Sequence, residues 1–273
     1  MNQMAKVSGF QPVAPDLCSS EATGELRGRD GTSSEVVWQL PHEVPVALQF
    51  NSEPYTVMMA TPADLRDFAI GFSIAEGLIK DAAVVKGVLV MPVENGITVD
   101  IAVADGAIDP ARLVRRSIEG RSGCGLCGVE DIADAIRPLK PVARSNATST
   151  TAILNAAKAL ADHQPMNRLN RTVHGAAWVT MDGNIALVRE DVGRHNALDK
   201  LIGALKLAQT DLASGFVLMT SRCSYELVQK SVTAGIGALV TVSAPTALAH
   251  NLAVQSNLFL AALGPGGVVV FNP

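Results

Sequence analysis

Residues 238–242 read Ala-Leu-Val-Thr-Val, an apolar run typical of a strand that is buried on both faces of a sheet. Around this run, further apolar runs alternate with segments of helical periodicity. The pattern predicts strands at 176–180, 185–189, 216–220, 258–263 and 268–271, and helices at 151–161, 197–208, 225–234 and 246–254. Strands that alternate with helices favour an α/β fold with a largely parallel sheet covered by helices on both faces.

The first half of the chain predicts an α+β arrangement. Pro62 follows Thr61 and precedes an acidic first turn, which is typical of a helix start with Thr61 as the N-cap. This helix is expected to run to about Leu78. The other expected elements are strands at 35–40, 44–50, 55–60, 87–92 and 96–103, and helices at 109–118 and 129–136.

These patterns divide the chain into four parts. A flexible segment rich in Gly, Ser, Pro, Asp and Glu is expected over residues 1–34, and an α+β domain over residues 35–137. Residues 138–150 contain two prolines and a Ser/Asn/Thr cluster, which is typical of a linker. The α/β domain is expected over residues 151–273.

Composition and charge limit the classes of function. With 48% hydrophobic and 18% charged residues, the chain of 273 residues can bury a substantial core. Its net charge of −4 argues against a nucleic-acid-binding protein, which would normally be basic. Four cysteines are too few for a disulfide scaffold, and the N-terminus has no apolar signal region, so we expect reduced thiols and a cytoplasmic protein.

The sequence after Lys230 contains no Asp, Glu, Lys or Arg. Polar residues interrupt this stretch every few positions, whereas a membrane-spanning helix needs roughly 20 mostly apolar residues in a row. We therefore expect buried strands and helices here, and no insertion into a membrane. The same stretch offers apolar surface that a homodimer could bury.

Residues 121–128 read Arg-Ser-Gly-Cys-Gly-Leu-Cys-Gly and contain the pair Cys124 and Cys127. The surrounding glycines let the backbone bend and leave the sulfur atoms uncovered. Arg121 and the helix expected from residue 129 both favour the thiolate, which is the nucleophilic form of cysteine. The pattern indicates sulfur chemistry or metal binding rather than core packing.

Four interpretations of Cys124 and Cys127 are open. Two buried structural thiols fit poorly with the glycine-rich surroundings. Half of a zinc site would need a second pair of ligands from a partner chain, because Cys18 and Cys223 each stand alone, and we expect no bound metal. A dithiol redox switch and a persulfide carrier, in which one cysteine accepts sulfane sulfur and passes it on, fit the spacing equally well.

The densest polar stretch is residues 189–200, which follow a predicted strand and begin a predicted helix. Ligands of α/β proteins bind at the carboxyl ends of strands, often against helix N-termini. This stretch therefore suggests an anion or nucleotide pocket, with Arg194 and His195 as contacts and Asp191 as the orienting carboxylate. The alternative is an exposed, capped helix start with an internal ion pair.

Two further turns lie at strand ends. Ser221 and Arg222 precede a predicted helix, where serine is an N-cap by default, although this turn could line the same crevice as Arg194 and His195. The turn Gly264-Pro265-Gly266-Gly267 either simply links two strands or brings its backbone close to a phosphate.

Several blocks of the sequence together resemble the FdhD family, the sulfurtransferases accessory to formate dehydrogenase. They follow the family's order and approximate spacing: residues 61–72 with Glu76-Gly77, residues 123–128, residues 190–200, Ser221-Arg222 with Ser224-Tyr225-Glu226 and Lys230, and Ala244-Pro245-Thr246. The Glu-Asp-Val-Gly-Arg-His-Asn segment that begins at Glu190 is highly specific, whereas Cys-x-x-Cys alone is not. The resemblance covers nearly everything after about residue 35.

The resemblance implies a function. Members of the family take persulfide sulfur from a cysteine desulfurase and deliver it to the bis(molybdopterin guanine dinucleotide) molybdenum cofactor, before that cofactor enters the formate dehydrogenase apo-enzyme. Cys124 would be the persulfide cysteine and Cys127 its partner. The implied cofactor-binding residues, at which a guanine nucleotide could mimic the cofactor, are Arg194, His195, Ser221, Arg222, Leu263, Gly264, Pro265, Gly266 and Gly267. The alternative is a non-catalytic chaperone of the molybdenum cofactor, with the two cysteines as a redox or zinc clip.

The resemblance also implies a fold, because the family's second domain is similar to cytidine deaminases, with three α/β layers. Deaminases need His-x-Glu and Pro-Cys-x-x-Cys to hold zinc, and here His174-Gly175-Ala176 lacks the glutamate and no Pro-Cys-x-x-Cys occurs. The chain departs from the family near its C-terminus. There the family has a Gly-Phe-x-Arg segment, and residues 264–267 lack both the aromatic residue and the arginine.

Overall fold

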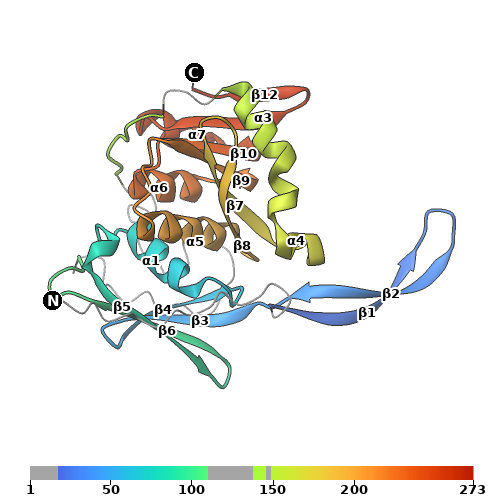
Figure 1. The fold of residues 1–273 in the computed structure, drawn as a ribbon, viewed down its shortest axis with the longest axis horizontal. Coiled ribbons are helices and arrows are strands. Elements are labelled where there is room, and N and C mark those ends of the chain that lie inside the picture. The colour runs from blue at the N-terminus through green and yellow to red at the C-terminus, as the bar shows by residue number, and fades with distance from the viewer. Residues whose placement is uncertain (1–17, 110–137, 146–148, 273) are drawn as a thin grey trace, which may run out of the picture.

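The computed structural model describes residues 18–109, 138–145 and 149–272 (Figure 1). The N-terminal half forms a two-stranded ribbon and a four-stranded sheet with strand order β4-β3-β6-β5. One α-helix, α1, and one short 3₁₀ helix, η2, lie between the strands of this sheet in the sequence. The elements of this half are β1 (Ser19–Arg27), β2 (Ser33–Pro41), β3 (Val44–Phe50), β4 (Glu53–Ala60), α1 (Leu65–Ala75), η2 (Ala82–Val84), β5 (Val85–Val93) and β6 (Gly96–Val103).

The C-terminal half is built on a six-stranded sheet with strand order β12-β11-β10-β9-β7-β8. Strands β9, β10 and β11 run parallel to one another, whereas β7 is antiparallel to both of its neighbours and β12 is antiparallel to β11. The strands of this sheet are β7 (His174–Thr180), β8 (Ile185–Asp191), β9 (Gly215–Cys223), β10 (Ala238–Pro245), β11 (Phe259–Gly264) and β12 (Gly267–Val270).

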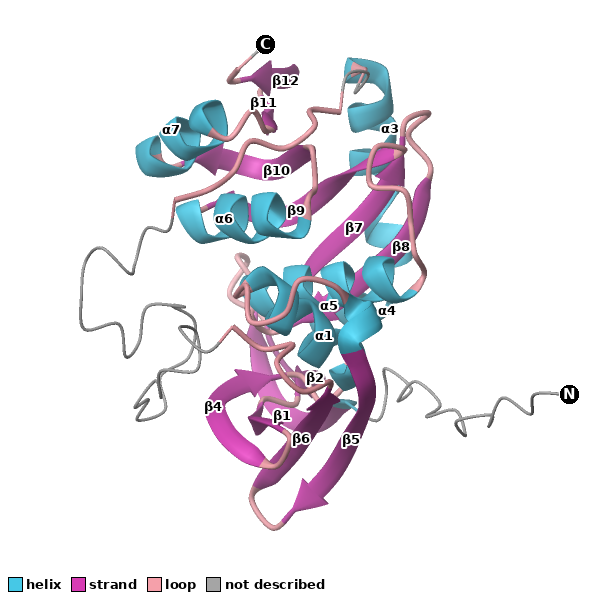
Figure 2. Cartoon of the chain, turned by 90° about the vertical axis from the view of Figure 1, so that its left-hand side faces the viewer, coloured by secondary structure: helices cyan, strands magenta, loops and turns pink. Residues whose placement is uncertain are grey.

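Helices cover this sheet on both faces and give it three layers (Figure 2). Alternate residues of the central strands pack to opposite sides: Met219 and Leu239 belong to the core beneath α5, α6 and α7, and Leu218 and Val240 to the core beneath α3 and η4. The helical elements are α3 (Thr150–Ala159), η4 (Leu160–His163), α4 (Pro165–Asn170), α5 (Arg194–Leu207), α6 (Tyr225–Ala234) and α7 (Ala247–Gln255).

The expected α/β fold class is confirmed, but the sheet is mixed rather than largely parallel. Parallel pairs need a crossover connection, and only the β9–α6–β10 and β10–α7–β11 connections supply one between neighbouring strands. The tight turns at 181–184 and 265–266 instead fold β8 and β12 back as antiparallel edge strands. The charge-free C-terminal stretch forms the end of α6, strands β10, β11 and β12, and helix α7, and no helix among the described residues is long and apolar enough to cross a bilayer.

Among the described residues, the structure differs from the sequence-based expectation at two places in the N-terminal half, and the helices expected at 109–118 and 129–136 fall, except for Asp109, on residues 110–137, outside the described ranges. Residues Ser19–Arg27, expected to be flexible, form β1, because β2 offers nine residues as an antiparallel partner. Helix α1 begins at Leu65 rather than near Pro62, after Asp64 in a left-handed conformation (φ 52°). Thr61 is not its N-cap, because the Thr61 hydroxyl instead accepts a hydrogen bond from the Val192 backbone N–H at 3.1 Å.

The two halves share one hydrophobic core across the expected linker. Phe68, Ile70 and Phe72 of α1 belong to the same buried cluster as Leu198 and Leu201 of α5. Helices α1 and α5 touch at two glycines: a Cβ atom on Gly71 would lie 1.7 Å from the Asp199 carbonyl oxygen, and one on Gly203 would lie 1.9 Å from the Asp67 carbonyl oxygen. This close contact places the N-terminal half directly against the helix that carries the 190–200 block.

Candidate functional site

Five strand termini lie side by side along one border of the six-stranded sheet, at the carboxyl ends of its parallel strands. We refer to this border as the sheet edge. His174 at the start of β7 pairs with Asp191 at the end of β8. On the other side of β7, the parallel strands β9 and β10 end side by side, with Arg222 paired to Ser243, and β11 ends at Gly264. The strand order therefore brings the 190–200 block and the Gly264–Gly267 turn to the same edge as Ser221 and Arg222, which lie in the last residues of β9 rather than in the expected turn.

Two helices start at this edge without a side-chain cap. The N-cap residue of α5 is Gly193, which has no side chain to offer, and the N-cap residue of α6 is Ser224, whose hydroxyl does not accept from the helix. By contrast, the Thr246 hydroxyl caps α7 by accepting from the Ala249 N–H at 3.2 Å. The N-cap residues of α5 and α6 therefore supply no side-chain acceptor to the starts of their helices, an arrangement that suits an anionic ligand.

His195 links the starts of these two helices. Its Nε2 atom lies 3.0 Å from Glu226 Oε2 and 3.3 Å from Ser224 Oγ. Burial lowers the pKa of His195, although the hydrogen bond to Glu226 and the charge of Glu226 act in the opposite direction. Burial alone would raise the pKa of Glu226, but the hydrogen bond from His195, together with Ser224 and Arg194, outweighs it and lowers that pKa to about 2. A neutral ring that donates Nε2–H to a carboxylate keeps Nδ1 as an acceptor.

His174 lies at the same edge. Its Nδ1 atom is 3.5 Å from the Thr220 hydroxyl oxygen. Burial, and then the nearby Arg194 and His195, lower the pKa of His174. The arginine side chains at this edge are Arg194, which is half-buried, and Arg222, which is exposed. Both are cations, which again favours an anion.

Asp191 anchors the loop before α5 to the N-terminal half. Its carboxylate accepts hydrogen bonds from the backbone N–H groups of Thr61 (3.0 Å) and Gly193 (2.8 Å) and from Asn196 Nδ2 (3.0 Å). It also pairs with Lys200 Nζ at 2.7 Å, and both side chains are fully buried. Asp191 was expected to orient a ligand contact; the structure shows that it fixes the backbone that begins α5.

A buried charge cluster of Lys230, Asp199 and Glu76 lies one helical turn beyond His195 along α5. Lys230 Nζ on α6 lies 2.8 Å from Asp199 Oδ2 on α5 and 3.2 Å from Glu76 Oε1 at the end of α1. Burial raises the pKa of Asp199 to about 6, in spite of the opposing charge of Lys230. Burial would lower the pKa of Lys230, but Asp199 and Glu76 outweigh it and raise that pKa.

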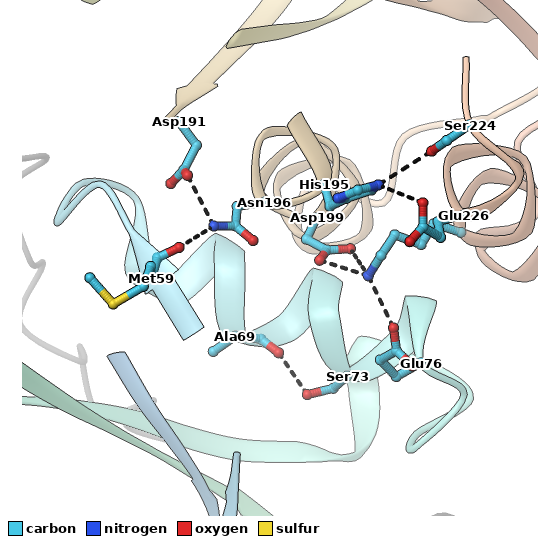
Figure 3. A network of polar contacts seen from close by, with 11 residues as sticks. Met59, Ala69, Ser73, Glu76, Asp191, His195, Asn196, Asp199, Ser224 and Glu226 are labelled. Carbon is cyan, nitrogen blue, oxygen red and sulfur yellow. Dashed lines mark hydrogen bonds and ion pairs between the residues drawn. The ribbon is translucent and has the colours of Figure 1, made fainter. Parts of the chain in front are cut away.

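The His195–Glu226 pair and the Asp199–Lys230 pair form a ladder between α5 and α6 (Figure 3). His195 and Asp199 are four residues apart on α5, and their partners Glu226 and Lys230 are four residues apart on α6, so each helix presents one polar face to the other. Glu76 extends this ladder to α1, and the Phe72 ring lies beneath Lys230, with its centroid 5.3 Å from Nζ. We refer to His195, Glu226, Asp199, Lys230 and Glu76 as the polar ladder.

The residues predicted to contact a ligand form two separate groups along the sheet edge. Arg194 and His195 lie together at the start of α5, and the buried Ser221 hydroxyl donates to the Arg222 carbonyl at 2.9 Å. Leu263, Gly264 and Gly267 belong to the β11–β12 hairpin, and Pro265 and Gly266 form its turn, where Gly266 has a φ of 80°. Strand β11 lies three positions from β7, a separation of about 14 Å at the usual strand spacing. A ligand that contacts both ends of this edge must therefore be elongated.

Cys124 and Cys127 lie outside the described residues, so the structure does not place them relative to this edge. Cys223, which is described, is fully buried, and burial raises the pKa of its thiol to about 12. Within the described ranges, no group of three or more His, Cys, Asp or Glu side chains is arranged to hold a metal ion.

Sequence reasoning missed the partners of the ladder. Glu226 and Lys230 belong to the family-like blocks, yet nothing in their local sequence assigns them to His195 and Asp199 on another helix. The matching four-residue spacing on two predicted helices was the available signal, because it predicts one polar face on each. Glu76 carries no such signal, since it is 154 residues from Lys230 in the sequence.

A family model and several curated relatives match most of the chain. The FdhD/NarQ family matches residues 41–269. Curated relatives described as "Sulfur carrier protein FdhD" include those of Cupriavidus necator, 47% identical over 85% of this chain and 81% of the relative, and of Bordetella petrii, 42% identical over 89% and 87%. The relative from Variovorax paradoxus is 45% identical over 84% of this chain and 82% of its own length.

A solved structure has the same fold. It is a crystal structure of a protein from Desulfotalea psychrophila, assigned as a formate dehydrogenase accessory protein. The TM-score is 0.73 with 23% sequence identity, and the match covers 94% of this chain and 97% of the other. At this identity the comparison supports the architecture described above.

Proposed function

Because the chain belongs to the FdhD/NarQ family, we propose that it is a sulfur carrier for the maturation of formate dehydrogenase. It takes persulfide sulfur from a cysteine desulfurase and transfers it to the bis(molybdopterin guanine dinucleotide) molybdenum cofactor, which is its substrate. The observation that carries this proposal is the pair Cys124 and Cys127, set among glycines in a chain 42–47% identical to curated sulfur carriers.

The first step is a thiol–persulfide exchange. The Cys124 thiolate attacks the outer sulfur of the desulfurase persulfide, a new S–S bond forms on Cys124, and the desulfurase cysteine leaves as a thiolate. No oxidant or reductant is needed, because the sulfane sulfur keeps its oxidation state. One accessible thiolate suffices for this step, so Cys127 is assigned to the later release of the sulfur.

The sheet edge is the proposed site for the cofactor. Arg194, Arg222 and the two uncapped helix starts supply the positive potential that guanine nucleotide phosphates require. The Leu263–Gly267 hairpin, about 14 Å away along the edge, matches the length of a dinucleotide better than that of a small anion. The hairpin lacks the family's aromatic residue and arginine, so it contributes backbone contacts only.

Three further assignments belong to the same proposal. The protein acts in the cytoplasm, where a cysteine desulfurase can supply sulfur and thiols stay reduced. It docks with the formate dehydrogenase apo-enzyme after loading the cofactor. It functions as a homodimer.

Mass spectrometry after incubation with a cysteine desulfurase and cysteine tests the sulfur transfer. We expect the peptide that contains Cys124 to gain at least one sulfur atom, which a thiol reductant removes. Cys124→Ala should abolish this gain and the maturation of formate dehydrogenase, and Cys127→Ala should still load sulfur on Cys124. The matched control is Cys223→Ala, because the buried Cys223 thiol, with its raised pKa, should take up no sulfur.

Two outcomes would overturn the proposal. One is normal maturation of formate dehydrogenase by Cys124→Ala. The other is near-stoichiometric zinc, or only an internal Cys124–Cys127 disulfide, in wild-type protein that never gains sulfur; the chain would then be a cofactor chaperone. Binding of a guanine nucleotide, measured by calorimetry with Arg194→Ala, tests the sheet edge separately from the cysteines.

A further inference from the structure

His195 and Glu226 form an enclosed pair where α5 meets α6 (Figure 3). The two residues are 6% and 8% exposed, and His195 Nε2 lies 3.0 Å from Glu226 Oε2. Among the described residues, the other ring nitrogen, Nδ1, has no hydrogen-bond partner. Buried polar atoms almost always have a partner, so Nδ1 calls for one that the described part of the chain does not supply.

The charge of Glu226 decides which ring nitrogen carries the proton. Burial would raise the pKa of Glu226, but the hydrogen bond from His195, with Ser224 and Arg194, lowers that pKa to about 2, so the carboxyl group is ionised at neutral pH. An ionised carboxylate is an acceptor only. The His195 Nε2 atom therefore donates, and in the neutral ring Nδ1 then carries no proton and is an acceptor.

Ser224 supports the same assignment of the proton. Its hydroxyl oxygen lies 3.3 Å from His195 Nε2, and its hydrogen bond to Glu226 contributes to the lowered pKa of that carboxyl group. Because the carboxylate only accepts, the Ser224 hydroxyl donates its single proton to Glu226 and keeps its lone pairs for Nε2. Both neighbours of Nε2 are thus acceptors, which makes Nε2 the donor toward each of them.

The pair is held in this arrangement before a ligand binds. One helical turn further along, Lys230 Nζ on α6 lies 2.8 Å from Asp199 Oδ2 on α5 and fixes the two helices against each other. The His195 ring and the Glu226 carboxylate therefore keep their relative position, and groups that are already ordered lose little entropy on binding.

Arg194 and the start of α5 place hydrogen-bond donors beside this acceptor. Arg194 directly precedes His195 and has only N–H donors, and the N-cap residue Gly193 supplies no side-chain acceptor. A phosphate group accepts from such donors. Its ionised oxygens have no proton for His195 Nδ1, however, so a ligand that satisfies the whole site also carries an O–H or N–H group beside its phosphate.

We propose that Glu226 is a positioning residue that holds His195 Nδ1 as the acceptor for a hydroxyl group next to the phosphate of the ligand. This inference rests on the proposed function, in which the sheet edge binds the nucleotide part of the cofactor. It names the chemistry that the edge selects: a sugar phosphate such as a nucleoside diphosphate, rather than bare phosphate or pyrophosphate. In a nucleotide the ribose directly follows the phosphate, whereas the base lies one sugar further away. The ribose hydroxyls are therefore the donors nearest to the residue that follows Arg194.

Nitrogen-15 NMR of the full chain tests the position of the proton. At about pH 8 the ring is neutral, because the ordinary pKa of histidine is about 6.5 and burial lowers the pKa of His195. Wild-type His195 should carry its proton on Nε2. In Glu226→Gln the side-chain amide can also donate to Nε2, so a population with the proton on Nδ1 should appear. The chain has five histidines, and the His195 signals are identified by their loss in His195→Gln.

Calorimetry with three probes tests the role of that acceptor. The probes are guanosine diphosphate (GDP), its dideoxy analogue, which lacks both ribose hydroxyls, and inorganic pyrophosphate. Wild-type protein should bind GDP roughly tenfold more tightly than the dideoxy analogue, because the analogue leaves a buried acceptor unpaired. Since the analogue keeps the guanine base, the comparison separates the ribose hydroxyls from the N–H groups of the base.

The variants separate positioning from a purely structural role. His195→Gln keeps an amide near the place of Nε2 but no atom at the place of Nδ1, so the ratio of the two affinities should fall to about one, and Glu226→Gln should lower it to an intermediate value. Pyrophosphate affinity should stay unchanged in Glu226→Gln. Glu53→Gln, the same carboxyl-to-amide change at an exposed residue of β4, is the matched control and should keep the wild-type ratio. A purely structural role would weaken all three probes by the same factor.

Three outcomes would overturn this proposal alone. They are a wild-type ratio near one, an equal ratio in wild type and Glu226→Gln, and a wild-type His195 ring with its proton on Nδ1. If wild-type protein bound none of the three probes, the sheet edge would fall as the proposed cofactor site, and this proposal with it. Sulfur loading of Cys124 is measured independently of all these outcomes.

Discussion

Single residues of the polar ladder hold charge where water cannot reach it. Asp199 and Lys230 are 1% and 5% exposed, and each depends on the other, since an unpaired buried charge costs several kcal/mol. The ladder therefore fixes the relative position of α5 and α6, and through Glu76 that of α1. His195 takes its orientation from the same ladder, which links the geometry of the candidate site to the packing of the core.

The pH dependence of stability should report the buried Asp199. Burial raises the pKa of Asp199 from its ordinary value of 3.8 to about 6, so the folded state binds this proton more tightly than the unfolded state. Its contribution to the free energy of unfolding should fall by about 3 kcal/mol as pH rises from about 4 to about 6, and stay low above that.

Urea unfolding between pH 4 and pH 7 measures this term. Asp199→Asn should remove the fall over this range, so that the difference between variant and wild type changes with pH. Asp105→Asn, at an exposed turn, serves as the control and should follow the wild-type profile. A constant difference between Asp199→Asn and wild type across the range would contradict the prediction.

At the scale of elements, the docking of α1 on α5 depends on two glycines rather than on large side chains. Gly71 and Gly203 let the two backbones touch, and Phe68 and Phe72 of α1 then reach the shared core. The cost of this design is two helix positions at which alanine would have the higher helix propensity.

Gly203→Ala should therefore destabilise the protein although alanine favours helices. The new Cβ atom would lie 1.9 Å from the Asp67 carbonyl oxygen, which is backbone and cannot rotate away, so the helices must separate. We expect a loss of about 1–3 kcal/mol in the free energy of unfolding by chemical denaturation. Gly87→Ala has open space around its new Cβ atom and should change stability little; an equal loss in both variants would argue against the close helix contact.

The sequence predicted elements best where local signals mark both ends. Helix α6 was predicted at its observed bounds, Tyr225–Ala234, because Ser224 precedes it and Gly235, which adopts a φ of 86°, follows it. Strand β1 was missed because its Gly- and Ser-rich composition is typical of flexible chain, and its partner strand decides otherwise. The start of α1 was misplaced because Thr61 is engaged by Asp191 and Val192, distant residues that no local pattern reveals.

Part of the candidate site could also be predicted from the sequence, and part could not. The α5 start with Arg194 and His195 and the turn at Gly264–Gly267 follow from strand–helix alternation, and the structure places both at one sheet edge. The polar ladder did not follow, since only the tertiary fold pairs α5 with α6 and brings the end of α1, far away in the sequence, to both. Within the ladder, the contact of Glu76 with Lys230 depends on the glycine contact between α1 and α5.

At the scale of the whole molecule, the core shared by the two halves predicts that they unfold as one cooperative unit. The buried cluster that includes Phe68 of α1 also includes Trp178 of β7 and Leu260 of β11. Two separate domains would unfold independently, whereas one continuous core should give a single transition.

Phe68→Ala tests this cooperativity. The substitution empties a fully buried site in the N-terminal half and should cost about 3–5 kcal/mol. The emission of Trp178, in the C-terminal sheet, should report the same lowered midpoint as far-UV circular dichroism. The assay uses Trp38→Phe as background, so that Trp178 is the remaining tryptophan. A Trp178 transition that stays at the parent midpoint would show that the halves unfold separately.

The distance along the chain between α1 and α5 has a consequence for synthesis. Gly203 leaves the ribosome about 130 residues after Gly71, which at roughly 5–20 residues per second is a delay of about 7–25 s. During that interval the phenylalanines of α1 have no α5 to cover them, and they present the kind of apolar helix that chaperones bind. The nascent N-terminal half should therefore be a chaperone client until the second half arrives.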